Sequence, residues 1–185
     1  MLRDVKTLAP GFLLSMPQLG DPNFHRAVVL MLEHSEAGSM GLVVNRGTGL
    51  TLGDLAEGQS LPCAPSRARE QVYLGGPVEP QRGFVLHDDA EVAEKHTLLP
   101  GLYLSVTMDT LGPLLTRTES RLRFCLGYAG WGPHQLEQEM AQGSWLFTEA
   151  ASAPVLELPP EAVWDSLLRQ MGVDPAMLVM GKGLN

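Results

Sequence analysis

The residue types best suited to catalysis gather around one expected strand-to-helix turn. Cys125 lies in an apolar strand, and His134 and Glu137 follow it within a dozen positions. A cysteine acts as a nucleophile when a nearby base lowers its pKa, and a histidine with a carboxylate can share general acid–base work. One hypothesis is therefore a small thiol- or His/Glu-dependent enzyme, or a redox sensor. The alternative for Cys125, between Phe124 and Leu126, is a small packing residue.

Other candidate motifs are incomplete. His87-Asp88-Asp89 offers an imidazole and carboxylates, but its place at a strand end is typical of a solvated turn. Cys63 lies in an expected loop with no base beside it. The chain has no phosphate-binding loop, dinucleotide fingerprint, nucleophile elbow or zinc-spaced ligand set. We assign no catalytic residue and expect no cofactor and no metal.

Turns and strand ends offer a different kind of site. Gly75-Gly76-Pro77 follows a strand, and such turns can present backbone N–H groups to an anion; a plain tight turn is the alternative. Trp131, between two glycines, is either a core plug or a contact for a ligand or partner. Because ligands are usually met at such positions, the sequence predicts a binding surface. Its members are Asn45, Gly75, Gly76, Pro77, Gly130, Trp131, Gly132 and Gln135.

The Trp131 region has a specific local pattern. A strand is expected over 121–128, then a tight glycine-rich turn, then a short helix that starts at Pro133 and ends before Gly143. Leu136 and Met140 are spaced to pack inward, while His134, Glu137 and Gln138 face water. The stretch therefore predicts a structural corner that could also carry a contact surface.

The remaining elements are mostly strands. The apolar run 27–32 predicts a central strand that forms a hairpin with 40–45, and further strands are expected over 12–17, 71–78, 83–87, 102–107 and 143–147. Thr51 and Asp109 are expected to cap short helices. Because the strands come as adjacent pairs, the pattern favours an α+β fold with mostly antiparallel sheets. We expect one domain over 1–185, with an exposed, mobile loop near 57–69 and an amphipathic C-terminal helix near 160–171.

Composition excludes several classes of protein. The chain has a net charge of −8, and its 13 Lys and Arg residues are scattered. Even the closest group, Arg117, Arg121 and Arg123, is typical of solvated charges at a strand edge, so the charge argues against direct DNA binding. The chain shows no signal-peptide pattern and no apolar run of membrane-spanning length. With two lone cysteines, these features predict a cytoplasmic protein that does not contact the membrane.

Five blocks in order resemble the YqgE/AlgH family of bacterial proteins. They are 11–17, 21–28, His34 with 41–46, 75–78, and 126–139 through Trp145. One departure is Arg46-Gly47, where the family commonly has Arg-Pro. The resemblance implies a compact domain of bifurcated, coiled sheets flanked by short helices. It implies no catalytic residues, and the family, of uncertain function, is often labelled as transcriptional regulators.

The sequence thus leads to two hypotheses of different kinds. The first is a non-enzymatic binding or regulatory module with a protein or small-molecule partner that the sequence does not identify. The second is the small enzyme or redox sensor described above. The sequence does not determine the oligomeric state.

Overall fold

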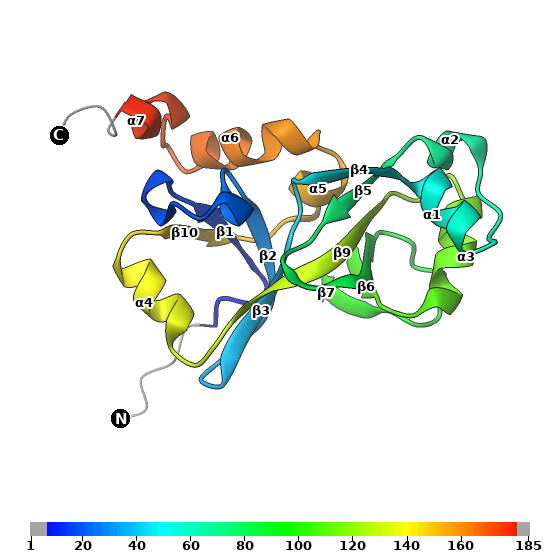
Figure 1. The fold of residues 1–185 in the computed structure, drawn as a ribbon, viewed down its shortest axis with the longest axis horizontal. Helices are drawn as coiled ribbons and strands as arrows, with labels where there is room; N and C mark the ends of the chain where they lie inside the picture. The colour runs from blue at the N-terminus through cyan, green and yellow to red at the C-terminus, as the bar shows by residue number, and fades with distance from the viewer. Residues whose placement is uncertain (1–6, 181–185) are drawn as a thin grey trace.

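The computed structural model describes residues 7–180 and shows a strongly curled sheet with short helices around it (Figure 1). Within residues 7–180 the sheet has ten strands: eight follow the order β10-β1-β2-β3-β9-β6-β8-β7, while β5 pairs with β9 and β4 pairs with β5. The strands are β1 (Gly11–Ser15), β2 (Val28–Ser35), β3 (Gly38–Val43), β4 (Gly47–Thr51), β5 (Gln71–Leu74), β6 (Val78–His87), β7 (His96–Leu99), β8 (Leu102–Ser105), β9 (Leu122–Trp131) and β10 (Trp145–Glu149). All pairs are antiparallel except β5 with β9, which confirms the predicted α+β class.

The helices are short and lie around this sheet. Two single 3₁₀ turns fill the connection from β1 to β2. The helices are η1 (Pro17–Leu19), η2 (Pro22–Phe24), α1 (Leu52–Gly58), α2 (Pro65–Ala68), α3 (Met108–Thr116), α4 (Gln135–Ala141), α5 (Ser152–Leu156), α6 (Pro160–Gln170) and α7 (Pro175–Met180). Figure 1 shows α6 and α7 along one side of the β1–β2 region, with α1, α2 and α3 at the other end of the molecule.

The strands β1, β2 and β3 carry the centre of the core. The predicted hairpin is confirmed: β2 and β3 pair antiparallel, with Leu30 opposite Leu42. The first four residues of β2 are fully buried because other residues pack on both faces of the sheet. Helix α6 packs on one of these faces. Its apolar residues are buried as the amphipathic pattern predicts, namely Val163, Trp164, Leu167 and Leu168. The helix begins at Pro160, also as predicted.

Strand β9 joins the two halves of the sheet and is longer than expected. It runs on to Trp131, because Gly130 and Trp131 pair with Met40 and Ser39 of β3. The tight turn predicted after Tyr128 is therefore wrong. Helix α4 starts at Gln135 rather than Pro133, since His134 takes a left-handed conformation (φ 62°) and ends the irregular segment.

Several other predictions need correction. Thr51 does cap α1 through a capping box, but α3 starts after Thr107, so Asp109 lies inside its first turn. Helix α5 was not expected. The predicted loop 57–69 contains the end of α1 and all of α2; its mobility stays a prediction. From sequence, residues 1–9 also have the pattern of a short helix or arm. Residues 1–6 of this segment lie outside the described residues, and no helix begins at 7–9.

The segment 57–69 has an anchor that its sequence does not reveal. Arg67 of α2 is buried, with its guanidinium bonded to Glu70 and to the carbonyls of Arg117 and Ser120. The predicted solvated group of arginines is also partly wrong. Arg123 is buried over the ring of Tyr73 and donates to the carbonyl of Val44. Both arginines hold backbone carbonyls that the strands do not use, a role that sequence position does not reveal.

Candidate ligand-binding site

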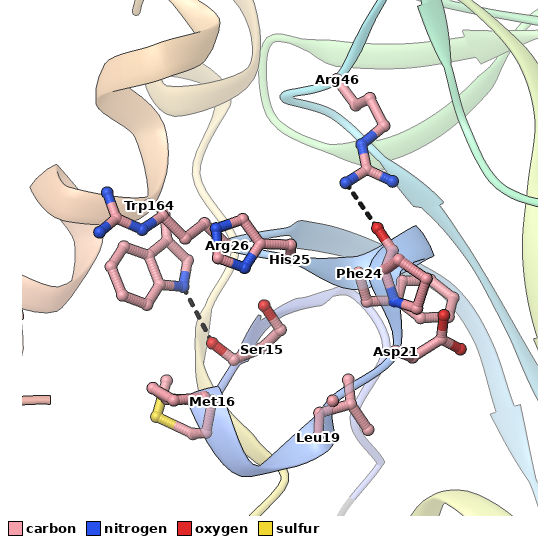
Figure 2. Close-up of a pocket in the computed structure, with 12 residues that line it drawn as sticks. Ser15, Met16, Leu19, Asp21, Phe24, His25, Arg26, Arg46 and Trp164 are labelled. Carbon is pink, nitrogen blue, oxygen red and sulfur yellow. Dashed lines mark hydrogen bonds between the residues drawn. The ribbon is translucent and has the colours of Figure 1, made fainter. Parts of the chain in front are cut away.

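A cavity of about 610 Å³ lies where the β1–β2 connection meets α6 (Figure 2). Its apolar walls come from Met16, Leu19, Phe24 and Trp164, and its polar groups from the turn before β2. This volume lies within the range of small-molecule sites, which are mostly apolar with a few polar groups. The lining residues are Ser15, Met16, Pro17, Leu19, Gly20, Asp21, Pro22, Phe24, His25, Arg26, Arg46 and Trp164.

Local chemistry explains the shape of the β1–β2 connection. Pro17 and Pro22 each start a 3₁₀ turn, where their fixed φ suits the first position. Asp21 caps the second turn, because its Oδ1 accepts the backbone N–H of Asn23 at 2.9 Å. Gly20 closes the first turn with φ 70°. The connection is therefore a built wall with its own internal bonds.

Asn45 fixes the other end of this connection. Its side-chain carbonyl accepts the N–H of Val28 at 2.9 Å, and its amide donates to the carbonyl of Arg26 at 2.9 Å. Between these bonds Arg26 has a φ of 48°, which is uncommon for a residue with a side chain. Such conformations persist where surrounding bonds over-determine them, and they cluster at functional sites. Asn45, a predicted surface residue, thus sets the backbone of a cavity residue.

Arg46 and Trp164 complete the walls. The Arg46 guanidinium donates to the carbonyls of Asn23 (2.5 Å) and Pro22 (2.9 Å), so its position is fixed by the turn it grips. The Trp164 indole Nε1 donates to the Ser15 carbonyl at 3.0 Å, which orients the ring. The guanidinium carbon of Arg26 lies 5.3 Å from the centre of that ring. Figure 2 shows Arg26 beside the indole.

The cavity is rich in positive charge although the chain is acidic. The guanidinium groups of Arg26 and Arg46 line it, and Asp21 is the one carboxylate among its described lining residues. Within residues 7–178, whose side chains the structure describes, the Arg26 guanidinium forms no ion pair and donates no hydrogen bond. Its side chain is also exposed. Arg26 is thus a cation whose donors stay available at the cavity.

The predicted Gly75-Gly76-Pro77 turn packs against β9. The Gly75 N–H donates to the Leu126 carbonyl at 2.7 Å, so that group is not available to an anion. A Cβ on Gly76 would lie about 2 Å from the backbone of Tyr128, which explains the need for glycine. Of the two alternatives, the tight turn describes the two glycines. Pro77 is exposed beside them, and its role as a contact stays a prediction.

Trp131 belongs to a closed corner. Its side chain is 6% exposed, and its Nε1 donates to Glu139 Oε2 at 2.9 Å. Trp145 donates to the same oxygen at 2.8 Å, and the ring centre of Phe24 lies 5.5 Å from that of Trp145. The core-plug alternative therefore describes Trp131. The role of Glu139, whose carboxylate accepts both indole N–H groups, was not predicted from sequence.

The other predicted residues of this corner form its rim. Gln135 accepts the N–H of Gly132 at 3.0 Å and donates to Glu139 Oε1 at 3.2 Å, so it closes the helix start. Gly130 and Trp131 also border an open groove of about 450 Å³ with Tyr128. The predicted surface residues therefore do not converge on one site. Asn45 shapes the cavity, residues 75–77 lie between β5 and β6, and the others lie at the end of β9 and the start of α4. A ligand or partner contact at β9 and α4 stays a prediction.

The residues proposed for catalysis are not arranged for it. Cys125 is fully buried, and burial raises the pKa of its thiol to about 12, so it is protonated at neutral pH. Glu137 lies 3.3 Å from Nε2 of His34, not beside His134, which is exposed. Cys63 is half-buried, and desolvation raises the pKa of its thiol. A fully buried, protonated thiol such as that of Cys125 is typical of a structural cysteine.

His87 corrects another prediction, because it is fully buried rather than solvated. Its Nδ1 accepts the N–H of Asp89 at 3.2 Å, so Nε2 carries the proton and donates to Ser105 Oγ at 2.9 Å. Burial lowers the pKa of the imidazole, against an opposing effect of Asp89. Asp89 pairs with Arg117 at 3.2 Å. The cluster ties β6 to β8 and the following loop.

Across residues 7–180, no three His, Cys, Asp or Glu side chains come together in a way that would hold a metal ion. None of the helices in that range is both long and apolar enough to cross a membrane.

The cavity itself was not predicted from sequence. Asp21-Pro22-Asn23 has residue types typical of a turn, but nothing in the sequence assigns a role to the exposed His25 and Arg26 that follow. The available signal was a pair of basic residues directly before a fully buried strand. Trp164 was placed correctly on the buried face of α6, yet its partner across the cavity comes from a segment about 140 positions away, which periodicity does not reveal.

Comparison with known proteins gives a consistent result. A family model described as AlgH-like matches residues 12–176. A UPF0301 protein of Myxococcus xanthus is 71% identical over 181 residues, covering 98% of this chain and all of that protein. One from Photobacterium profundum is 38% identical over 183 residues, covering 95% and 98% of the two chains.

Solved structures agree in fold. The solution structure of the AlgH protein from Pseudomonas aeruginosa matches with a TM-score of 0.74 and 34% identity, covering 97% of this chain and 96% of that one. A crystal structure of a protein from Corynebacterium diphtheriae matches with a TM-score of 0.67 over 92% and 90% of the chains. At 23% identity, the second likeness concerns the fold alone.

Proposed function

The chain belongs to the AlgH-like family, and we propose that it is a non-enzymatic binding module that takes a small molecule in the cavity between the β1–β2 connection and α6. The observation that carries the proposal is the way the cavity is built. Side chains of Asp21, Asn45, Arg46 and Trp164 each bond to backbone atoms of the wall. A site preorganised in this way loses little entropy when a ligand binds.

Two observations favour binding over catalysis. The buried Cys125 thiol, with its pKa raised to about 12, is not a ready nucleophile. The acid–base pair of the enzymatic hypothesis is divided, because Glu137 contacts His34 and His134 faces solvent. Neither Cys125 nor His134 lines the cavity.

The proposal includes a setting. We place the module in the bacterial cytoplasm, where its two free thiols would stay reduced. We expect a regulatory role of the module to depend on contacts with a ligand or a protein, since a net charge of −8 opposes direct DNA binding. The partner protein in such a role is not identified by the site.

Retention of small molecules from a cell extract tests the proposal. Wild-type protein is incubated with filtered Myxococcus xanthus extract, washed by ultrafiltration and denatured, and the released compounds are identified by mass spectrometry. Leu19→Trp fills the cavity, and Leu50→Trp adds the same ring at an exposed position outside the cavity lining. We expect wild type and Leu50→Trp to retain the same compounds and Leu19→Trp to lose them. Equal retention by all three, or no retained compound, would reject the proposal.

A further inference from the structure

We propose that the cavity selects small organic anions, with the Arg26 guanidinium holding a carboxylate or phosphate and the apolar wall holding the rest of the molecule. The inference rests on the proposed function and adds the chemical class of the ligand. It starts from the two arginines of the cavity, which differ in what they already bind.

Arg46 has a structural task. Two of its nitrogens donate to the carbonyls of Asn23 and Pro22, so these donors are not available to a ligand. Its guanidinium still contributes a positive charge at the cavity wall. Arg26 has no such partner among the described side chains, and its contact is the face of Trp164. A guanidinium that lies on a ring face keeps its N–H donors at its edge. These donors match the two oxygens of a carboxylate or phosphate.

The surrounding charges favour an anion. Arg46 lines the same cavity, and the carboxylate of Asp21 already accepts the Asn23 N–H. The positive φ of Arg26 is maintained by the Asn45 amide on its carbonyl. A strained backbone at an exposed arginine contributes nothing to the core, which is why we connect it with binding.

The apolar wall defines the rest of the ligand. Met16, Leu19, Phe24 and Trp164 line the cavity, and Figure 2 shows Met16 and Leu19 on the side away from Arg46. A molecule with an anionic head and an apolar or aromatic body would place its head at Arg26 and its body against these side chains. The volume of about 610 Å³ accommodates a ligand of two fused rings with such a head.

Titration calorimetry with three matched probes tests the inference. Naphthyl phosphate and naphthylacetate carry the two kinds of anion, and naphthylacetamide is the neutral counterpart. We expect one or both anions to bind and the amide to bind at least about 10-fold more weakly. Arg26→Gln should weaken anion binding about 10- to 100-fold. Arg26→Lys, which keeps the charge without the planar fork, should lie between.

Arg82→Gln is the matched control, because Arg82 is also exposed and also lies over an aromatic ring, that of Phe84, at 5.0 Å. It should leave binding unchanged, and thermal unfolding of each variant checks the fold. Equal binding of the amide, an unchanged affinity in Arg26→Gln, or no binding of any probe would overturn the inference. The extract experiment tests the proposed function independently of the anion. If wild type retains neutral compounds that Leu19→Trp loses, the cavity is a binding site but its ligand is not an anion.

Discussion

The protein has two tryptophan sites, and in each the indole rings lie beside a charged side chain that is bonded differently. At the corner of β9, β10 and α4, Trp131 and Trp145 turn their N–H groups to one oxygen of Glu139. At the cavity, Trp164 turns its N–H to the backbone and its face to Arg26. In the corner, the Glu139 carboxylate accepts both indole N–H groups, so its oxygen is occupied by internal bonds. In the cavity, the N–H donors of the Arg26 guanidinium stay available. This difference distinguishes the structural corner from the proposed binding site.

Phe24 connects the two regions. It lines the cavity, and its ring centre lies 6.4 Å from that of Trp131 and 5.5 Å from that of Trp145. One wall of the open site thus rests on the closed one. We expect substitutions in the corner to change stability and substitutions at Arg26 to change binding, and the following predictions test this division in order of expected effect.

The largest effect should come from Trp131→Ala. Removing a buried tryptophan leaves a cavity, and the free energy of unfolding should fall by about 3–5 kcal/mol. Urea unfolding followed by circular dichroism measures the loss. Trp131→Phe keeps most of the ring and should lose less. If Trp131→Ala unfolds within about 1 kcal/mol of wild type, Trp131 is not the plug described here.

Glu139→Ala should come next. It removes the acceptor of two indole N–H groups in a half-buried site, and hydrogen bonds to a charged group are worth about 1.5–3 kcal/mol each before solvent replaces part of them. We expect a loss of about 2–3 kcal/mol, which is about 5–10 °C in melting temperature for a chain of this size. Gln138→Ala, at an exposed position on the same helix, is the control. Equal melting temperatures for both variants would contradict the shared-acceptor account.

The buried His87 extends the contrast to pH. Its folded pKa lies below the ordinary 6.5, so the unfolded chain binds the proton more readily than the folded one. Its contribution is complete above pH 6.5 and is lost as the pH falls from there towards the folded pKa. Asp88, Asp89 and Lys95 act on the same ring.

Unfolding free energies at neutral and mildly acidic pH, for wild type and His87→Gln, isolate this contribution. Wild type should lose more stability on acidification than the variant does. The prediction fails if the difference between the two proteins is the same at both pH values.

Arg26 should show the smallest effect on stability. Arg26→Gln loses an exposed cation–π contact worth about 0.5–1 kcal/mol. Arg26→Gly loses the same contact but relieves the positive φ, so it should be the more stable variant by about 0.5 kcal/mol after the cost of glycine in the unfolded chain. Chemical denaturation of both variants checks the order. A glycine variant clearly less stable than the glutamine variant would mean that the backbone of Arg26 is not strained.

Sequence reasoning reached the regular parts of this fold for physical reasons. The apolar runs of β2 and β3, the N-cap at Thr51 and the buried face of α6 are local patterns, and each was predicted. Failures occurred where a distant partner decides the outcome. Strand β9 continues through Gly130 because β3 pairs with it, and His87 is buried because β8 supplies Ser105. The cavity was not predicted for the same reason, since Arg26 and Trp164 come into contact only in the folded chain.

The most direct test follows the three indole N–H signals in a two-dimensional NMR spectrum of nitrogen-labelled protein, assigned with single Trp→Phe variants. The chain has three tryptophans, one in the open site and two in the closed corner. Titration with whichever naphthyl anion binds in calorimetry, the phosphate or the acetate, should shift the Trp164 signal saturably and leave those of Trp131 and Trp145 nearly unchanged. Shifts of the Trp131 or Trp145 signals with a constant Trp164 signal would contradict the assignment of the binding site.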